Sequence, residues 1–333
     1  MTTTPTSPQR IKDLRAYLNL HQEQLADLLG VPQSMVSYAE RGERDPQRVI
    51  ERARRLPDTP EGFFDRPTPT YTADDLNLRL KKLPKVTERG VVATFAEIEA
   101  TARAAITHPW VPVAVDAGQR TTALPLQAIE EIAQRTRNLL RVEPTGPVHN
   151  VTRAMATARI PVAKLANPHL DLSKIDGVSS PWDASQRPVV ATTECEDGGR
   201  VRFTRAHELG HLVLHSINPP TDVRVREDEA NLFAGAFLLP ETDARAAVSA
   251  GLRLEGYGRV KSQYLISLAA TVQRARALGI IDADRHLSLR KQLSSRGWTR
   301  KEPIRIPVER YSFAPTSRPP QQPATRPHLR VVK

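Results

Sequence analysis

The sequence predicts an α+β protein: an N-terminal all-α domain, a linker, a domain with a small sheet, and a helical C-terminal extension. Three observations predict this organisation. Apolar residues recur at helical spacing through residues 9–56. A Pro-rich stretch at 57–70 then separates this module from the rest of the chain. Further on, short apolar runs bounded by Gly and Pro, typical of strands, precede a helix that carries the pattern H-E-x-x-H.

Length, apolar content and cysteine usage narrow the class of protein. The chain has 333 residues, which is long for a single domain. It contains no apolar run near the ~20 residues that span a bilayer, and its N-terminus lacks the apolar core of a signal peptide. The single cysteine, Cys195, allows no internal disulfide and is interpreted as a free thiol. We therefore expect a cytoplasmic protein with no membrane partner.

Positive charge is concentrated at the C-terminal end of the chain. The formal net charge is +11, and residues 253–333 hold 17 Lys and Arg against 5 Asp and Glu. The basic character therefore lies outside the region with the H-E-x-x-H pattern. A basic segment of this kind attracts nucleic acid, and a solvated basic surface is the alternative.

Residues 9–56 are predicted to form four short helices. Gly30 and Gly42 stand where the second and third helices should end. The tight turn between these two helices predicts a helix-turn-helix. The four predicted helices are Arg10–Leu18, Gln22–Leu29, Gln33–Arg41 and Pro46–Leu56.

The residues around this turn resemble a known family. Residues 22–31, followed by Gln33-Ser34-x-x-Ser37-x-x-Glu40-Arg41-Gly42, closely resemble the Xre/phage-repressor DNA-binding domains. In such a module the third helix enters the major groove of double-stranded DNA, and dimers bind two half-sites, so the resemblance also implies a homodimer. The alternative is that the module contacts only protein, because its net charge is only about +2. The residues expected to reach bases or phosphates are Gln22, Gln33, Ser34, Ser37 and Tyr38.

Two segments connect this module to the rest of the chain. Residues 57–70 are rich in proline and predict a linker. Residues 71–118 predict a mostly helical connector, with Leu76, Leu78 and Leu80 followed by an apolar stripe over 95–106. We assign no chemistry to either segment.

The pattern His207-Glu208-x-x-His211 predicts a metal site. On a helix, positions i and i+4 share one face, so both histidines can direct a ring nitrogen at the same ion. Glu208 lies about 100° round the same turn, where its carboxylate can take a proton from water on the metal. Two imidazoles leave a catalytic zinc ion one protein ligand short. We therefore expect Zn²⁺, Glu208 as the catalytic base, and a third ligand elsewhere.

The third ligand is expected from the acid-rich helix that follows. Glu229 shares a face with apolar residues at i+3, i+4 and i+7, so it should point inward. Glu227 and Asp228 fit that face less well and suggest a solvated helix start. We therefore favour Glu229 and keep Glu227 as the alternative.

Together these motifs resemble a second known family. Thr204-x-x-His-Glu-Leu-Gly-His-Leu-x-Leu-His, followed by Glu-Ala-Asn-x-Phe-Ala and Leu-Leu-Pro, resembles the ImmA/IrrE zinc metallo-endopeptidases. The resemblance implies a gluzincin-like zinc peptidase domain, which we place at 119–241. Arg205 departs from the family, which usually has an apolar residue there. The resemblance implies a leading helix at 129–141 and strands at 160–162, 176–179 and 187–190.

Three further features are expected around the motif helix. Residues 188–193 form an apolar run directly before it, and in zinc peptidases of this architecture that edge strand pairs with the extended substrate. Thr204 is a candidate N-cap of the helix. His215 lies on the metal side but about 12 Å along the axis from His207, which is too far for a ligand. For His215 we expect packing or a hydrogen bond in the transition state.

The last part of the chain is predicted to be helical and then disordered. Residues 242–305 show an amphipathic, basic helical pattern, similar to the helical tail of ImmA/IrrE proteins. Such an extension could contact DNA, the substrate or a sister subunit. Residues 306–333 are rich in Pro and Arg and predict disorder.

Two functions of different class follow from these features. The first is a zinc endopeptidase that its DNA-binding domain brings to DNA, where it cleaves a transcriptional repressor or a similar regulatory protein. Cleavage of a repressor rests on the resemblance alone. The second is an Xre-type transcriptional regulator whose metal domain senses a ligand without proteolysis. Glu208 favours the first, because a sensor has no need of a catalytic base.

Overall fold

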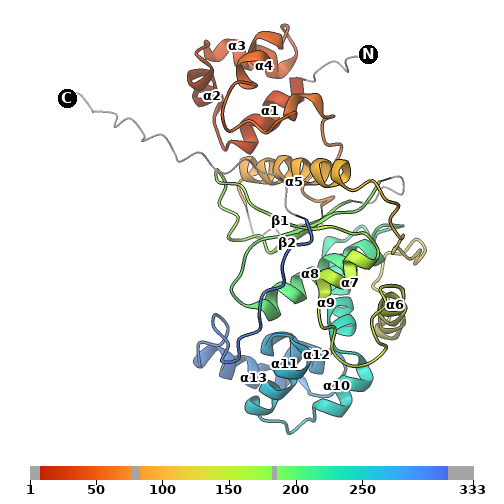
Figure 1. The fold of residues 1–333 in the computed structure, drawn as a ribbon. Helices are drawn as coiled ribbons and strands as arrows, with labels where there is room; N and C mark the ends of the chain where they lie inside the picture. The colour runs from red at the N-terminus through yellow and green to blue at the C-terminus, as the bar shows by residue number, and fades with distance from the viewer. Residues whose placement is uncertain (1–7, 77–82, 182–185, 314–333) are drawn as a thin grey trace, which may run out of the picture.

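The computed structural model describes residues 8–76, 83–181 and 186–313. A small helical domain lies at one end, followed by one long helix, a three-stranded sheet and a larger group of helices (Figure 1). The predicted α+β class is therefore confirmed. No helix in these residues has both the length and the apolar character that a membrane crossing requires. The helices are α1 Pro8–Tyr17, α2 Gln22–Leu29, α3 Gln33–Arg41, α4 Gln47–Ala53, η1 Phe63–Asp65 (a 3₁₀ turn), α5 Lys85–Ala105, α6 Leu126–Leu139, α7 Val151–Thr157, α8 Gly198–Leu214, α9 Val223–Leu238, α10 Glu241–Ala247, α11 Leu254–Tyr264, α12 Leu268–Ala277 and α13 Ala283–Ser295, and the strands are β1 Val162–Lys164, β2 Gly177–Ser179 and β3 Val190–Thr192.

The first domain has the four helices that the sequence predicts. Gly30 (φ 61°) and Gly42 (φ 72°) end α2 and α3 in the left-handed conformation, which a residue without a Cβ adopts at little cost. Leu14, Leu25 and Val36 are fully buried in the small core between the helices. The helix-turn-helix is therefore formed by the glycines and the apolar spacing on which its prediction rested.

The Pro-rich segment 57–70 packs on this domain as well as leading out of it. Phe63 and Phe64 of η1 are buried in the same apolar cluster as α1–α4. The guanidinium of Arg10 lies 3.8 Å from the centre of the Phe63 ring. The two phenylalanines therefore extend the small core beyond residue 56.

Within the described residues of the predicted connector 71–118, α5 is the only helix, and Leu78 and Leu80 lie outside those residues. α5 lies between the first domain and the sheet (Figure 1). A Cβ on Gly90 would lie 2.7 Å from the carbonyl oxygen of Ala16, so only glycine allows α1 to approach this closely. Phe95 is buried in a cluster that includes residues of the sheet. α5 thus packs against both neighbours.

Buried polar contacts hold the first domain to α5 and to the loop after β1. Glu97 of α5 accepts hydrogen bonds from Arg10, at 2.9 Å, and from Arg66. The side-chain amide of Asn167 donates to the carbonyl oxygen of Tyr17 at 3.0 Å and to Thr94 Oγ1 at 2.8 Å. Separating the domains would leave these groups without partners unless water replaced them, so the contact resists separation.

The sheet has the strand order β1-β3-β2, with β1 parallel and β2 antiparallel to β3. The apolar run at 188–193 forms β3, which is the central strand. Our expectation that this run forms the edge strand beside the motif helix is therefore wrong. The edge strand that contacts α8 is β2. Strand order is set by pairing between distant segments, which a local apolar pattern does not specify.

The motif helix α8 begins earlier than predicted. Asp197 is its N-cap, and its Oδ1 atom accepts a hydrogen bond from the Gly199 backbone N–H at 2.8 Å. Thr204 lies inside the helix, so its predicted role as N-cap is wrong. Gly198 and Gly199 have low intrinsic helix propensity, so the sequence does not indicate that the helix begins there.

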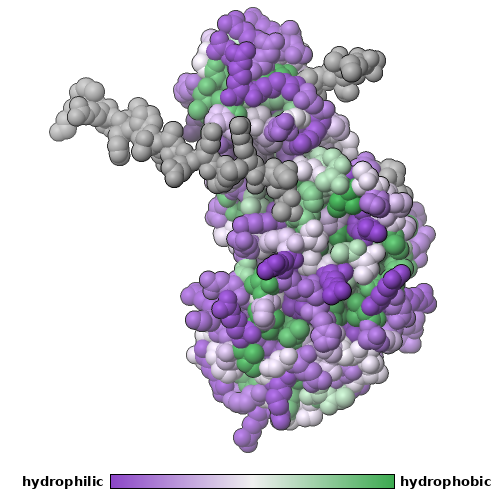
Figure 2. Space-filling view, viewed as in Figure 1, coloured by the Kyte–Doolittle hydropathy of each residue, from purple (hydrophilic) through white to green (hydrophobic). Residues whose placement is uncertain are grey.

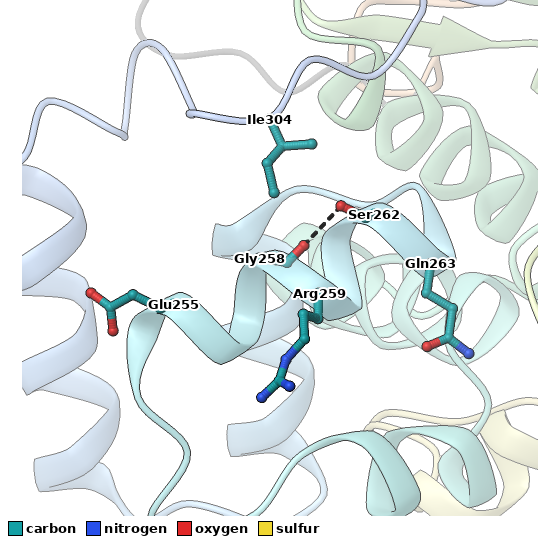
Figure 3. A pocket seen from close by; sticks show the side chains of 6 residues that line it. All are labelled: Glu255, Gly258, Arg259, Ser262, Gln263 and Ile304. Atoms are coloured by element: carbon teal, nitrogen blue, oxygen red, sulfur yellow. Dashed lines mark hydrogen bonds between the residues drawn. The ribbon is translucent and has the colours of Figure 1, made fainter.

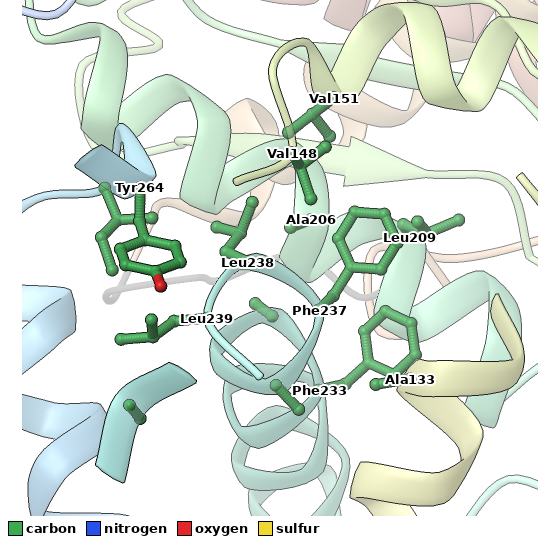
Figure 4. Packing of buried hydrophobic residues seen from close by; sticks show 14 of the residues in the cluster. Ala133, Val148, Val151, Ala206, Leu209, Phe233, Phe237, Leu238, Leu239 and Tyr264 are labelled. Carbon is green, nitrogen blue, oxygen red and sulfur yellow. The ribbon is translucent and has the colours of Figure 1, made fainter. Parts of the chain in front are cut away.

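Helix α9 packs directly on α8 and supplies large aromatic side chains to the core. A Cβ on Gly210 would lie 3.3 Å from the Cα of Ala230, so the glycine allows close approach of the two helices. Phe233 and Phe237 stack with ring centres 6.0 Å apart, next to Leu209 of α8 (Figure 4). This packing fixes the position of α9 relative to the H-E-x-x-H turn.

Residues 242–305, predicted as a separate extension, contribute to the same core as α8 and α9. Leu254, Tyr257 and Leu289 are buried in one apolar cluster with the residues of those helices. Arg274 is buried too, and its guanidinium pairs with Glu130 of α6. Part of the positive charge of this region is therefore neutralised inside the protein, where it is not available to nucleic acid.

A C-terminal strap, which we define as residues 302–313, crosses the start of α8 and returns to the sheet (Figure 1). Its Ile304 faces α11 at Gly258 (Figure 3). The carbonyl oxygen of Ile306 accepts a hydrogen bond from the Gly198 N–H at 3.2 Å, and the Ser312 N–H donates to Val162 of β1 at 3.0 Å. Residues 306–313 are thus packed on the domain, and the prediction of disorder from residue 306 is wrong there; residues 314–333 lie outside the described residues.

Two glutamates anchor the strap to buried cations. Glu309 accepts a hydrogen bond from Arg202, lies 3.5 Å from Arg205, and also accepts from two backbone N–H groups at the start of α7 at 2.9 Å each. Glu302 pairs with Lys261, which is fully buried. Arg205, the departure from the ImmA/IrrE pattern, therefore has its charged partner in the strap. The Pro and Arg content of residues 306–333 gave no indication of the anchor at Glu309.

Replacing Glu309 with Gln should destabilise the protein, because the substitution removes the charge that faces Arg202 and Arg205 but keeps the shape. Removing one partner of a buried ion pair costs about 3–5 kcal/mol, and urea unfolding should show a loss of this order. The exposed Glu196→Gln is the control, with an expected change within about 0.5 kcal/mol. Equal stability of the two variants would contradict the anchoring role of Glu309.

Candidate metal centre

Two histidines of α8 and one glutamate of α9 converge inside the larger domain. The Nε2 atoms of His207 and His211 are 3.0 Å apart. One carboxylate oxygen of Glu227 lies 3.2 Å from His211 Nε2, and the other lies 3.5 Å from His207 Nε2. The three groups offer ligand atoms that all lie within 4.8 Å of one another. The predicted histidine pair is therefore brought together, with the carboxylate of Glu227 beside it.

Glu229, which the sequence favours as third ligand, lies elsewhere. Its carboxylate accepts hydrogen bonds from Arg120 at 2.7 Å and from the Leu124 backbone N–H at 2.6 Å, and it lies 2.9 Å from His215 Nε2. The apolar spacing correctly places Glu229 on the buried side of α9, but that side does not face the two Nε2 atoms. Glu227 reaches them, although its side chain is 21% exposed and the sequence assigns it to the solvated helix start. The geometry thus favours the alternative.

Burial and hydrogen bonding set the charge of this cluster. Burial lowers the pKa of His211 to about 4, even though Glu227 acts in the opposite direction. Burial alone would raise the pKa of Glu227, but the neighbouring imidazoles of His207 and His211 hold it well below its usual range. At neutral pH, His211 is therefore neutral and Glu227 is an anion. A neutral imidazole and a carboxylate are the forms that bind a metal ion.

Asn231 orients the first histidine. Its Oδ1 atom lies 3.1 Å from His207 Nδ1, so that a proton on Nδ1 is donated to the amide oxygen. The Nε2 atom, which faces His211 and Glu227, then carries the lone pair. Asn231 therefore favours the tautomer of His207 that can bind a metal.

Glu208 is buried on the side of α8 that faces the edge strand β2. The hydroxyl of Ser179 donates a hydrogen bond to Glu208 Oε2 at 2.8 Å. A Cβ on Gly177 would lie 3.0 Å from Glu208 Oε1, so the carboxylate packs directly on the backbone of β2. These two contacts hold the predicted base beside the strand.

His215 makes both of its ring-nitrogen contacts inside the protein. Its Nδ1 atom lies 2.9 Å from His211 Nδ1, and its Nε2 atom lies 2.9 Å from Glu229 Oε2. Burial lowers the pKa of His215 to about 4, although the hydrogen bond with Glu229 opposes this. Because both nitrogens are engaged, the structure favours the expected packing role of His215 over a hydrogen bond to a substrate.

In the helix-turn-helix, the predicted base contacts lie at the start of α3. Gln33 and Ser34 are exposed, and Gln33 Nε2 donates to Gln22 Oε1 at 2.9 Å. Gln22 in turn donates to Glu40 at 2.7 Å. Two of the five predicted residues thus hold each other, and hydrophilic side chains cover most of this domain on the face seen in Figure 2.

Ser37 and Tyr38 lie among arginines. Arg41 donates a hydrogen bond to Ser37 Oγ at 2.9 Å. The guanidinium groups of Arg41 and Arg44 lie 5.1 and 4.6 Å from the centre of the Tyr38 ring. Both arginines are exposed, so they are available to contact phosphates.

Family comparisons match each of these two regions. Residues 11–48 match the helix-turn-helix family model, and residues 168–276 match the model of the IrrE N-terminal-like domain. The chain joins an Xre-type helix-turn-helix domain to an IrrE-type, metallopeptidase-like domain. No curated protein matches the chain. The IrrE match covers α8 and α9 and continues through most of α12, which agrees with the common core of these helices.

The residues of the IrrE-type domain fit a zinc ion. Two imidazole nitrogens and one carboxylate form one of the known ligand sets of catalytic zinc. Magnesium and calcium instead prefer sites made entirely of oxygen atoms. The donor set of His207, His211 and Glu227 therefore suits zinc better than either of those ions.

Four residues around the cluster were not identified from the sequence. Asn231 belongs to the Glu-Ala-Asn motif, and this motif is the one feature of the sequence that could have indicated its role. Gly177 and Ser179 were placed in a strand, but nothing local indicated their contact with Glu208. Arg120 lies in irregular chain before α6, where no periodic pattern exists to predict a contact with Glu229.

Gly177→Ala should destabilise the IrrE-type domain by about 1–3 kcal/mol, the usual cost of overpacking a buried site. The new Cβ would lie 2.8 Å from Thr204 Cγ2 and 3.0 Å from Glu208 Oε1, so β2 or α8 must move. Gly251→Ala is the matched control, because a Cβ there meets no atom within 4 Å. If urea unfolding gave the same stability for both variants, β2 could not lie this close to α8.

Proposed function

We propose that this protein is a zinc-dependent endopeptidase that cleaves a regulatory protein, such as a transcriptional repressor, to control gene expression. The observation that carries the proposal is the arrangement on α8. His207 and His211 meet Glu227, and Glu208 of the same turn lies against the edge strand β2. In this proposal Glu227, rather than Glu229, is the third metal ligand.

The side chains around the cluster have separate roles in peptide hydrolysis. When bound, a zinc ion supplies Lewis-acid chemistry, which polarises the peptide carbonyl and makes water more acidic. Glu208 accepts the proton of the attacking water at a carboxylate oxygen and then transfers it to the leaving nitrogen. The hydroxyl of Ser179 holds Glu208 in place through a hydrogen bond to Oε2. Hydrolysis thus needs no other base.

The edge strand β2 is the proposed docking place for the substrate. Val178 pairs with Ala191 of β3, so the backbone groups of Gly177 and Ser179 are directed away from β3 in the antiparallel register. An extended peptide can add to such an edge as a further strand. The other edge of the sheet, β1, already contacts the C-terminal strap through Ser312. The substrate backbone would then lie beside Glu208.

We further propose that the helix-turn-helix binds double-stranded DNA, with Gln33 and Ser34 reading bases and Arg41 and Arg44 contacting phosphates. The exposure of Gln33, Ser34 and Arg41 on α3, and of Arg44 just after it, supports this role. Binding as a homodimer to two half-sites would bring the peptidase to proteins bound at the same DNA. The substrate would thus be selected by location as well as by sequence.

The second candidate function is a DNA-binding regulator whose metal domain senses a ligand without proteolysis. The buried contacts that Glu97 and Asn167 make between the domains favour it, because they provide a route by which one domain could influence the other. A sensor would not require Glu208 beside β2, and for that reason we prefer the peptidase.

Glu208→Gln should abolish cleavage, since loss of a general base costs typically 10²–10⁴-fold in rate. The test compares new protein N-termini and transcripts in cells that carry the wild type, Glu208→Gln or the exposed control Glu196→Gln. Termini made with the wild type and the control should be missing with Glu208→Gln. If no termini differ and the transcripts respond to all versions alike, the protein is a regulator without proteolysis.

Gln33→Ala or Ser34→Ala should each weaken binding to a DNA site selected by the wild type by about tenfold or more, from about 1–3 kcal/mol per base contact. Titrations at fixed salt concentration, followed by fluorescence anisotropy, measure the change. Gln263→Ala, an exposed position on α11, is the control. Unchanged binding by both α3 variants would exclude α3 as the helix that reads the bases.

A further inference from the structure

We propose that Arg120, Glu229 and His215 form a relay that positions His211 and fixes its tautomer for metal binding. The proposal rests on the metal site proposed above and assigns roles to three residues that are not metal ligands. We call these three residues the relay. They are positioning residues, since they act through His211.

The relay is a continuous chain of short contacts in the interior. Arg120 Nη2 donates to Glu229 Oε2 at 2.7 Å, and the same oxygen lies 2.9 Å from His215 Nε2. His215 Nδ1 then lies 2.9 Å from His211 Nδ1. The side chains of Glu229, His215 and His211 are at most 1% exposed, so water cannot easily substitute for any of these contacts.

The direction of each proton follows from the carboxylate. Glu229 Oε2 already accepts a hydrogen bond from Arg120, and a carboxylate oxygen accepts, so His215 donates to it from Nε2. A neutral imidazole has one N–H, and therefore His215 Nδ1 is an acceptor. The 2.9 Å contact of that atom with His211 Nδ1 is a hydrogen bond when His211 carries its proton on Nδ1. In that tautomer the lone pair of His211 lies on Nε2.

That lone pair points to the place where a metal is needed. His211 Nε2 is the atom that lies 3.0 Å from His207 Nε2 and 3.2 Å from Glu227. The opposite tautomer, with a proton on Nε2, could not bind a metal through this atom. The relay therefore does for His211 what the Asn231 amide does for His207. Such outer contacts orient ligands and raise their basicity.

The Glu229 end of the relay is held by the segment before α6, which lies outside α8 and α9. Besides Arg120, the backbone N–H of Leu124 donates to Glu229 Oε1 at 2.6 Å. The same segment is attached to α8, since the Val115 N–H donates to the carbonyl oxygen of Val213 at 2.8 Å. Three donors, which are Arg120, the Leu124 N–H and His215, thus converge on Glu229.

A purely structural role would have a different consequence. If the relay only attached the segment before α6 to α9, its loss would lower stability and leave metal affinity unchanged. Glu130, which pairs with buried Arg274 in the same domain, provides a control for that case. Glu130→Gln breaks a comparable ion pair that lies outside the relay.

The experiment measures zinc affinity of the full-length chain by competition with a chromophoric chelator. Glu229→Gln and His215→Phe should each weaken zinc binding by about 10–100-fold, the usual effect of losing an outer partner of a ligand. Glu130→Gln should match the wild type in zinc affinity while losing stability. Wild-type affinity in both relay variants would overturn the proposal.

A second measurement uses the zinc-free protein and needs no activity. Long-range ¹H–¹⁵N correlation spectra of chain labelled at histidine distinguish the two neutral tautomers. We expect His211 to carry its proton on Nδ1 in the wild type and in Glu130→Gln, and to lose this preference in Glu229→Gln. A proton on Nε2 in the wild type would overturn the relay.

The same titrations separate the relay from the metal site itself. Glu227→Gln removes a proposed ligand and should weaken zinc binding more than either relay variant. If Glu227→Gln does so but the relay variants bind like the wild type, the metal site stands and the relay fails. A wild-type chain that binds no zinc would overturn both.

Discussion

The close contact between α8 and α9 is the interaction on which the candidate site depends. Gly210 has no Cβ, and Ala230 has a small side chain, so the helices can approach until Glu227 reaches the histidines of α8. A larger residue at Gly210 would meet the ring of Phe233 at 3.0 Å and push the helices apart. The cluster is therefore a consequence of helix packing as much as of the H-E-x-x-H spacing.

Buried charges impose a second constraint, because each needs a partner of opposite sign. Those partners come from distant parts of the chain. Glu309 of the strap faces Arg202 of α8, and Glu97 of α5 faces Arg10 of α1. Each pair joins two elements that lie far apart in the sequence. Each pair therefore favours one packing arrangement of the elements that it joins. The strap, α5 and the segment before α6 are positioned in this way.

The local sequence determined the elements that depend on nearby residues. The boundaries of α2 and α3 follow from apolar spacing and from Gly30 and Gly42, which act within one turn. The pairing of His207 with His211 likewise follows from helical geometry alone. Short apolar runs likewise indicated strands near β1 and β3, whereas β2 was expected only from the resemblance to the ImmA/IrrE family.

Only the tertiary structure decided which side chains and strands contact one another. Helical periodicity shows that Glu229 is buried, but it does not show that Arg120 and His215 surround it while Glu227 reaches His207 and His211. Strand order and the packing of the strap were likewise undetermined, because they depend on contacts between residues far apart in the chain. A sequence pattern specifies the direction of a side chain relative to its own helix or strand. The partner it meets depends on how those elements pack.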